Sequence, residues 1–285
     1  MKFGQFEIRT FVEQHFKLDG GSMFGVVPKV MWNKLIPSDE YNMIPMVTNL
    51  FVLRAHGKNM IFDIGLGDTL SDREKKVYNT DGVSNLEPGL KALGLTPDAI
   101  DYVILTHLHT DHAGGAVRLV DGRYVPRFKN ARYIIDRKEW QAAINPDERT
   151  SAVYIPGRLL PLEEAGQVDF IEGDTELFDG IKAVHTGGHT EDHFALEIES
   201  EGKQVFYYAD IFPSQHHMKV PFVPATDLLP GESMAVKRAA VDRIVDQGVI
   251  MAFDHDIGAP LATFTRDGKK LVTHVVDELI GATQA

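Results

Sequence analysis

The sequence has 285 residues and a formal net charge of −12, with 44% hydrophobic and 25% charged residues. These values are typical of an ordinary globular protein that is long enough to bury a large core. The acidic balance argues against a nucleic-acid-binding surface, which needs a basic footprint. Because the chain has no cysteine, it has no disulfides, no thiolate metal ligands and no cysteine nucleophile.

The N-terminal residues 1–21 show no long apolar run behind a basic start, so we expect no signal peptide. No segment approaches the roughly 18 unbroken apolar residues of a membrane span. We therefore expect a cytoplasmic protein without a membrane partner.

Residues 20–46 fit no helix or strand period and hold Met23, Phe24 and Trp32 among glycines and prolines. One interpretation is a loop packed on the core, and the other is an apolar rim over a pocket, which suits flexible methionine and aromatic side chains. The next two runs, Val47–Ala55 and Asn59–Ile64, flank His56-Gly57-Lys58 and predict a hairpin.

Short strands and helices then alternate. A helix is expected at Glu87–Leu93, another from Arg137, and a longer one at Ser233–Gln247, which Ser233 can cap and Gly248 can end. Phe194–Ile198 and Gln204–Ala209 predict a second hairpin, and the fully apolar Val249–Phe253 predicts a buried strand. The remaining expected strands are Ile100–Leu105, Arg132–Ile135, Val168–Ile171 and Ile181–Val184. No linker divides the chain, so we expect one domain over residues 1–285, a sandwich of two sheets with helices outside.

The stretch THLHTDHAGG directly follows a strand and carries His107, His109, Asp111 and His112. Alternate residues of an extended segment point the same way, so His107 and His109 can bind one ion together. Asp111 and His112 are displaced and can bind a second. Imidazole and carboxylate without sulfur suit Zn²⁺, Mn²⁺, Co²⁺ or Fe²⁺.

Four ligands do not complete two metal sites, and further candidates stand where later apolar runs stop. These are His189 in HTGGHTEDH, Asp210 after VFYYA and His255 after VIMAFD. Ligands at strand ends can converge on one edge of a sheet.

The HxHxDH motif, the GHT histidine, the aspartate after a strand and the late histidine together resemble the metallo-β-lactamase superfamily. The resemblance runs from FDIGLGD at Phe62–Asp68 to His255. It implies an α+β fold, the αββα four-layer sandwich of two mixed β-sheets flanked by helices, with two metal ions, zinc first among the candidates. By position, His107, His109 and His189 would bind the first metal, Asp111, His112 and His255 the second, and Asp210 would bridge them. Asp63 and His193 would support the ligands from behind.

This resemblance implies a hydrolase in which two metals activate a bridging hydroxide, with Asp111 or Asp210 passing a proton to the leaving group. The surrounding sequences look most like quorum-quenching lactonases that open N-acyl-homoserine lactones. Organophosphate or phosphoester hydrolysis and thioester hydrolysis are the alternatives, and a metal-dependent scaffold without activity is a further one. A tyrosine that well-known lactonases carry three residues after the bridging aspartate is replaced here by Pro213.

The expected substrate is a small, neutral, apolar ester or lactone. Its candidate contacts are Met23, Phe24, Trp32, His216 and His217. Residues 20–46 could equally lie against a second subunit, so a homodimer is possible.

Overall fold

The computed structural model describes residues 1–276, whose contacts divide into two compact units. Among the described residues, the first unit combines Met1–Gln14 with Thr48–Glu172, and the second combines His15–Val47 with residues 173–276. Each unit holds several strands and helices and a share of the candidate ligands. That the whole chain acts as one domain stays a prediction.

A seven-stranded sheet is built mostly from the first unit, in the order β1-β2-β3-β4-β5-β8-β9. β3 and β4 pair antiparallel, whereas β4, β5, β8 and β9 are parallel neighbours, so the sheet is mixed. The expected hairpin is confirmed: His56 and Gly57 connect β3 to β4 with φ angles of 52° and 72°, the left-handed pair that a tight hairpin turn requires. The strands are β1 Lys2–Phe3, β2 Phe6–Asp19, β3 Met43–Ala55, β4 Lys58–Phe62, β5 Tyr102–Ile104, β8 Arg132–Asp136 and β9 Val168–Ile171.

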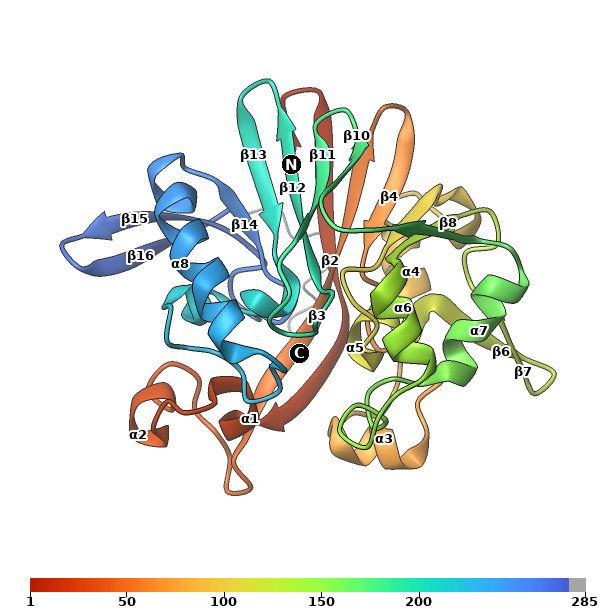
Figure 1. Cartoon of the computed structure of the whole chain (residues 1–285), viewed down its shortest axis with the longest axis horizontal. Helices are drawn as coiled ribbons and strands as arrows, with labels where there is room; N and C mark the ends of the chain where they lie inside the picture. The colour runs from red at the N-terminus through yellow and green to blue at the C-terminus, as the bar shows by residue number, and fades with distance from the viewer. Residues whose placement is uncertain (277–285) are drawn as a thin grey trace. The chain divides into compact units, whose positions relative to one another are not determined.

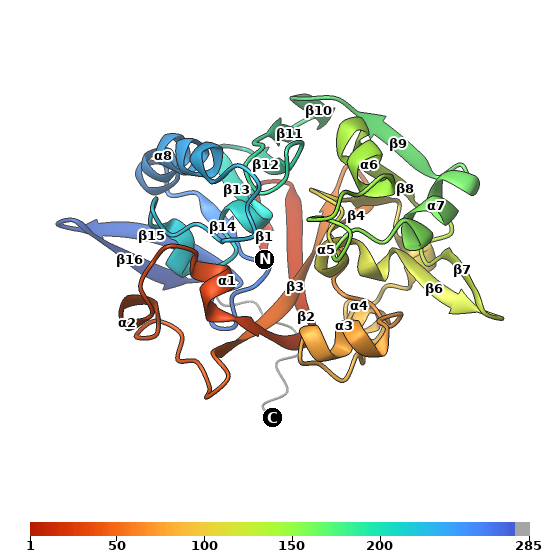
Figure 2. The same ribbon diagram turned by 60° about the horizontal axis from the view of Figure 1, so that its bottom comes forward.

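Helices of the first unit pack on this sheet through an apolar core. Leu90 of α4, Trp140 of α6 and Leu162 of α7 join Val103 of β5 and Tyr133 of β8 in that core. Figure 2 shows α6 and α7 beside β8 and β9. The helices are α3 Asp72–Val77, α4 Leu86–Ala92, α5 Thr110–Ala113, α6 Arg137–Ile144 and α7 Pro156–Glu164, with short 3-10 turns at Pro97–Ala99 and Gly114–Ala116 and a separate hairpin of β6 Val117–Val120 and β7 Arg123–Pro126.

The second unit contains a sheet whose strands β10 to β16 follow in chain order. Only β13 and β14 are parallel, because α8 connects them. α8 covers this sheet, as Figure 1 shows, and buries Ala240, Val241 and Ile244 against Phe206 and Phe264. The elements are α1 Gly20–Phe24, α2 Lys29–Trp32, β10 Thr175–Phe178, β11 Ile181–His185, β12 Phe194–Ser200, β13 Lys203–Tyr207, η3 Ala209–Ile211, η4 Gln215–Met218, α8 Pro230–Asp246, β14 Ile250–Ala252, β15 Leu261–Asp267 and β16 Lys270–Val275.

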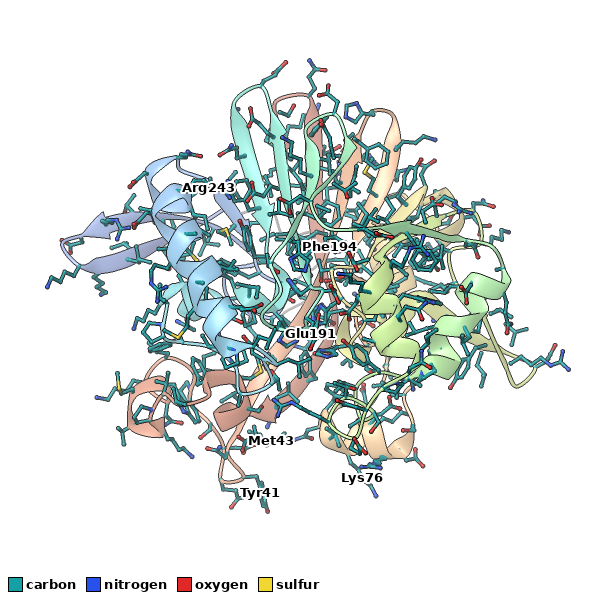
Figure 3. The ribbon with its side chains drawn as sticks, viewed as in Figure 1. Tyr41, Met43, Lys76, Glu191, Phe194 and Arg243 are labelled. Carbon is teal, nitrogen blue, oxygen red and sulfur yellow. The ribbon has the colours of Figure 1, made fainter. Side chains whose placement is uncertain are left out.

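Polar contacts also connect α8 to the sheet. Arg243, labelled in Figure 3, pairs with Glu197 of β12, and the Tyr208 hydroxyl donates to the same carboxylate at 2.6 Å.

One local expectation is wrong, and another is confirmed only in part. Ser233 does not cap α8, because Pro230 starts the helix and Leu229 is its N-cap residue. Residues 20–46 are not wholly a loop, since they form the short helices α1 and α2 before Tyr41 at an exposed tip (Figure 3).

Candidate metal centre

Two parallel strands of the first unit end at the same edge and deliver its candidate ligands. β4 stops at Phe62, directly before Asp63, and β5 stops at Ile104, shortly before His107. The Asp63 carboxylate accepts the Thr106 amide at 2.8 Å and contacts His112 Nδ1 at 2.9 Å. Asp63 thus links the two strand ends and turns Nε2 of His112 away from itself.

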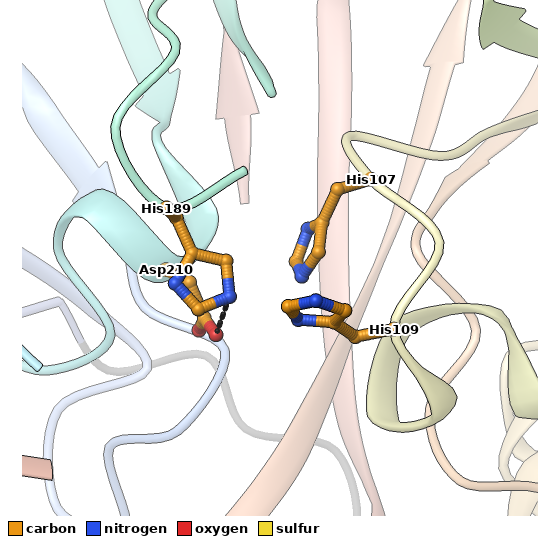
Figure 4. Close-up of side chains that lie close together, drawn as sticks. All are labelled: His107, His109, His189 and Asp210. Atoms are coloured by element: carbon orange, nitrogen blue, oxygen red, sulfur yellow. Dashed lines mark ion pairs between the residues drawn. The ribbon is translucent and has the colours of Figure 1, made fainter. Parts of the chain in front are cut away.

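The three histidines of this motif gather closely. The His107 ring centroid lies 4.6 Å from that of His109 and 4.0 Å from that of His112 (Figure 4 shows the first pair). Donor atoms of Asp63, His107 and His112 all lie within 4.8 Å of one another, close enough to hold a metal ion. All of these side chains are buried, with His109 the most exposed at 8%. Asp111 is half-buried.

The glycines beside the motif allow two backbones to touch. A Cβ on Gly114 would lie 2.3 Å from the Leu66 carbonyl oxygen, and one on Gly115 would lie 2.2 Å from that of Ile64. Gly67 faces the same segment with a φ of 68°. The loop after β4 and the 3-10 turn Gly114–Ala116 that follows α5 therefore pack backbone against backbone, which only residues without side chains permit.

Buried polar groups brace this contact. Glu13 accepts the amides of Leu66 and Gly67 at 3.2 Å each, and the Arg127 Nε donates to the Gly115 carbonyl at 3.0 Å. The loop and the 3-10 turn are each fixed from outside the motif.

Glu139 of α6 holds the histidine segment from behind. Its Oε1 accepts the Leu108 amide at 2.9 Å and the Tyr154 hydroxyl at 2.8 Å. The Tyr154 ring lies 5.0 Å from the His109 ring. The backbone between the two neighbouring ligands is thereby set by a carboxylate 31 residues away.

The second unit supplies candidate ligands from strand ends in the same way. His189 follows β11, Asp210 follows β13 and His255 follows β14, the parallel neighbour of β13. Nε2 of His189 lies 3.0 Å from Asp210 Oδ2, the ion pair dashed in Figure 4, and Nε2 of His255 lies 3.3 Å from Asp210 Oδ1. One carboxylate thus contacts two imidazoles through separate oxygens.

The other nitrogen of each imidazole is occupied. Asp227 Oδ1 contacts Nδ1 of His189 at 2.9 Å, and the Val47 carbonyl accepts from Nδ1 of His255 at 2.9 Å. A carbonyl can only accept, so His255 carries a proton on Nδ1 and faces Asp210 with Nε2. Burial disfavours a charged His189, but Asp210 and Asp227 outweigh it and raise the pKa of His189 to about 10. The same negative field attracts a metal cation.

His193 lies behind His189, with ring centroids 6.2 Å apart. Its Nδ1 contacts the Thr186 hydroxyl at 2.6 Å, and its carbonyl accepts the amides of Thr186 and Gly187. His193 therefore closes the loop that carries His189.

The chemistry of each donor set fits divalent metals. Both sets offer buried imidazole nitrogens beside carboxylate oxygens, the combination that binds Zn²⁺ and related ions without thiolates.

The candidate substrate contacts separate into two groups. Phe24 and Trp32 are buried at 0% and 2% exposure and stack at 5.4 Å, so they pack inside the unit and do not form an open rim. Met23 and His217 line a small cavity next to Pro213 and His255, whereas His216 is half-buried. Their contact with substrate stays a prediction.

Sequence reasoning did not find Glu13, Glu139 or Asp227. Each is a buried carboxylate in an unremarkable local context, although Asp227 stands just before the PGES start of α8. Glu13 follows the apolar pair Phe11 and Val12, but the polar Gln14 and His15 come next, so the local sequence gives no signal that this carboxylate is buried.

Comparison with known proteins places the fold. Over 126 residues the chain is 33% identical to an N-acyl homoserine lactonase of Bacillus sp.. This match covers 44% of the present chain and 42% of the lactonase. A probable metal-dependent hydrolase from Staphylococcus aureus shares 30% identity with a TM-score of 0.90, covering 98% of this chain and 100% of that one. AidC, a dizinc quorum-quenching lactonase, has the same fold at 17% identity, with a TM-score of 0.79 over 98% and 97% of the two chains.

Among residues 1–276, no helix is long and apolar enough to cross a membrane. The expected fold class is confirmed by the match of residues 43–255 to a family model and by these structural likenesses. The chain belongs to the metallo-beta-lactamase superfamily.

Proposed function

We propose that the chain is a metal-dependent hydrolase that opens lactones of the N-acyl-homoserine class. The observation that carries the hydrolase is the pair of buried imidazoles, His189 and His255, that both turn Nε2 toward Asp210. The lactonase relative supports the substrate class, although the match spans less than half of it.

The proposed ligand assignment follows the family pattern. By this pattern His107, His109 and His189 would hold one ion, Asp111, His112 and His255 would hold the other, and Asp210 would be shared by both. The two separate contacts of the Asp210 oxygens support its bridging role. A dizinc lactonase of the same fold supports the number and kind of ions.

Bound metals would polarise the ester carbonyl and activate water. The protein's own residues do the rest. Asp63 and Asp227 hold the Nδ1 atoms of His112 and His189, which keeps each Nε2 directed as a ligand. Asp111 or Asp210 then carries a proton to the leaving oxygen, as a carboxylate within reach of the site can.

The first experiment measures acid release from a long-chain N-acyl-homoserine lactone by the Zn²⁺- or Co²⁺-loaded protein. A chelated sample and His109→Ala are the inactive references, and His15→Ala, an exposed histidine on β2, is the matched control. Metal-dependent ring opening with kcat/KM above about 10⁴ M⁻¹ s⁻¹ supports the proposal.

A protein that holds two metals without opening lactones would keep the hydrolase and reject the lactone. Phosphotriesters and thioesters are then the substrates to assay. A protein that binds no metal, or turns over equally well after chelation, contradicts the metal-dependent mechanism itself.

A further inference from the structure

A small cavity in the second unit combines apolar walls with three polar side chains. Met23, Ile44 and Met46 contribute apolar surface, and Ser214, His217 and the candidate ligand His255 line it as well. Its volume is about 10 Å³, enough for one water molecule or a small group. The methionines are flexible and can make room for more.

The hydrogen bonds of His217 fix where its proton lies. Nε2 of His217 lies 2.9 Å from the Met23 carbonyl oxygen, which can only accept, so Nε2 carries the proton. Burial lowers the pKa of His217 to about 3, so the ring is neutral and Nδ1 has a lone pair. Nδ1 lies 2.8 Å from the Ser214 hydroxyl, which must therefore donate to it.

This donation determines what Ser214 can offer to a ligand. A hydroxyl has one proton and two lone pairs, and its proton is used by His217. The oxygen of Ser214 is consequently an acceptor toward the cavity.

Packing keeps the arrangement rigid. The His217 ring stacks on Phe24 at 4.8 Å, and its amide donates to the Ser214 carbonyl at 2.9 Å. The His255 amide donates to the Pro213 carbonyl at 3.0 Å, which ties the residue before Ser214 to the candidate metal ligand. The acceptor thus stands at a fixed place in the same cavity wall as the candidate ligand His255.

We propose that Ser214 is a specificity-determining residue whose oxygen accepts a hydrogen bond from an N–H group of the substrate. This inference rests on the proposed lactonase function. The hydrogen bond to Ser214 favours lactones that carry an amide N–H beside the ring over plain esters and phosphotriesters, which have no such donor.

The test compares the metal-loaded Ser214→Ala variant with the metal-loaded parent protein on two substrates. One substrate is an N-acyl-homoserine lactone, and the other is the same molecule with its amide nitrogen methylated, which replaces the N–H donor by a methyl group. We expect the variant to lose about five- to tenfold in kcat/KM on the first substrate, the effect of one neutral hydrogen bond, and little on the second. Calorimetric binding of the ring-opened N-acyl product provides a second readout and should weaken by a similar factor.

Ser200 is a buried serine at the end of β12, and Ser200→Ala is the matched control. It should leave kcat/KM unchanged on both substrates. Equal losses on both substrates in Ser214→Ala would show a merely structural role and overturn the inference while leaving the lactonase intact. If the parent protein does not turn over the unmethylated lactone, the proposed function is overturned, and the inference with it.

Discussion

The residues that orient the candidate ligands are buried carboxylates, and Asp227 is the clearest of them. It contacts Nδ1 of His189 through Oδ1, while Ser233 of α8 donates to its Oδ2 at 2.5 Å. Hydrogen bonds from the Leu228 and Leu229 amides to the His189 and Gly188 carbonyls join the same two segments. α8 thereby fixes the His189 loop through one carboxylate.

Asp227→Ala should weaken metal binding about 10- to 100-fold, because His189 loses the partner that sets its tautomer and ring orientation. Competition between the purified protein and a chromophoric chelator for Zn²⁺ measures the change. Asp246→Ala, at the exposed end of the same helix, is the control and should bind metal normally. Unchanged affinity in Asp227→Ala would remove its positioning role.

Glu13 is a second buried carboxylate, and its effect is on stability. Burial raises the pKa of Glu13 to about 7, against hydrogen bonds from Ser84, Thr48, Leu66 and Gly67 that lower it. The folded chain therefore keeps a proton that the unfolded chain, with a pKa near 4.5, gives up. Stability from this group is greatest below pH 4.5 and falls as the pH rises to about 7, by about 3 kcal/mol in all.

Glu13→Gln should flatten this part of the pH dependence, since the amide does not titrate. Urea unfolding between pH 5 and pH 8 measures the slope, whatever the variant's absolute stability. Glu40→Gln, at an exposed loop position, should keep the parent slope. A Glu13→Gln protein with the parent slope would place the titrating group elsewhere.

At the level of elements, the contact between the loop after β4 and the 3-10 turn Gly114–Ala116 depends on glycine. Gly115→Ala brings a methyl group to 2.2 Å from the Ile64 carbonyl oxygen and 2.9 Å from Leu86 Cδ1. Backbone must shift to admit it, so we expect a loss of about 1–3 kcal/mol in the free energy of unfolding. Gly157→Ala on α7 meets nothing within 4 Å and should cost nothing. Urea midpoints of the two variants decide whether the contact is tight.

Hairpins were predictable from sequence because local turn chemistry sets them, as His56 and Gly57 show. Other elements were missed. α1 and α2 have five and four residues, too few to show a helical period. The long strand β2 also escaped, since Phe11 breaks its alternation of buried and half-buried residues. The sequence predicts the start of α8 three residues too late. Ser233 donates a hydrogen bond to Asp227 and does not cap the helix, and Pro230 at the first helical position sets the boundary.

At the level of the whole molecule, residue types at strand ends predicted the candidate ligands. Most of the groups that hydrogen-bond to these ligands could not be predicted from the sequence. Ligand chemistry is visible in the sequence because imidazoles and carboxylates crowd into short motifs such as THLHTDH. The resemblance identified Asp63, which contacts Nδ1 of His112, but the partners of the other two Nδ1 atoms were not visible, since Val47 lies 208 residues from His255 and Asp227 lies 38 from His189. Only tertiary structure brings such groups together.

Metal removal tests the assignment on the entire chain. If two ions bind, each stabilises the folded state by mass action, and the metal-loaded protein should melt on the order of 10 °C above the chelated one. Differential scanning calorimetry, with metal content from atomic emission, measures both quantities. Mg²⁺ prefers oxygen ligands and should not restore the melting temperature that Zn²⁺ restores.

Asp210→Asn separates a bridging carboxylate from a simple ligand. Removing the one charge shared by both ions should reduce the bound metal below two per chain and shrink the melting shift, because neither ion keeps its full set of donors. Asp254→Asn changes the other buried carboxylate near His255, at 3.5 Å from its Nε2, and should do less. An Asp210→Asn protein that retains two ions and the parent melting shift would show that the bridge is formed by another group.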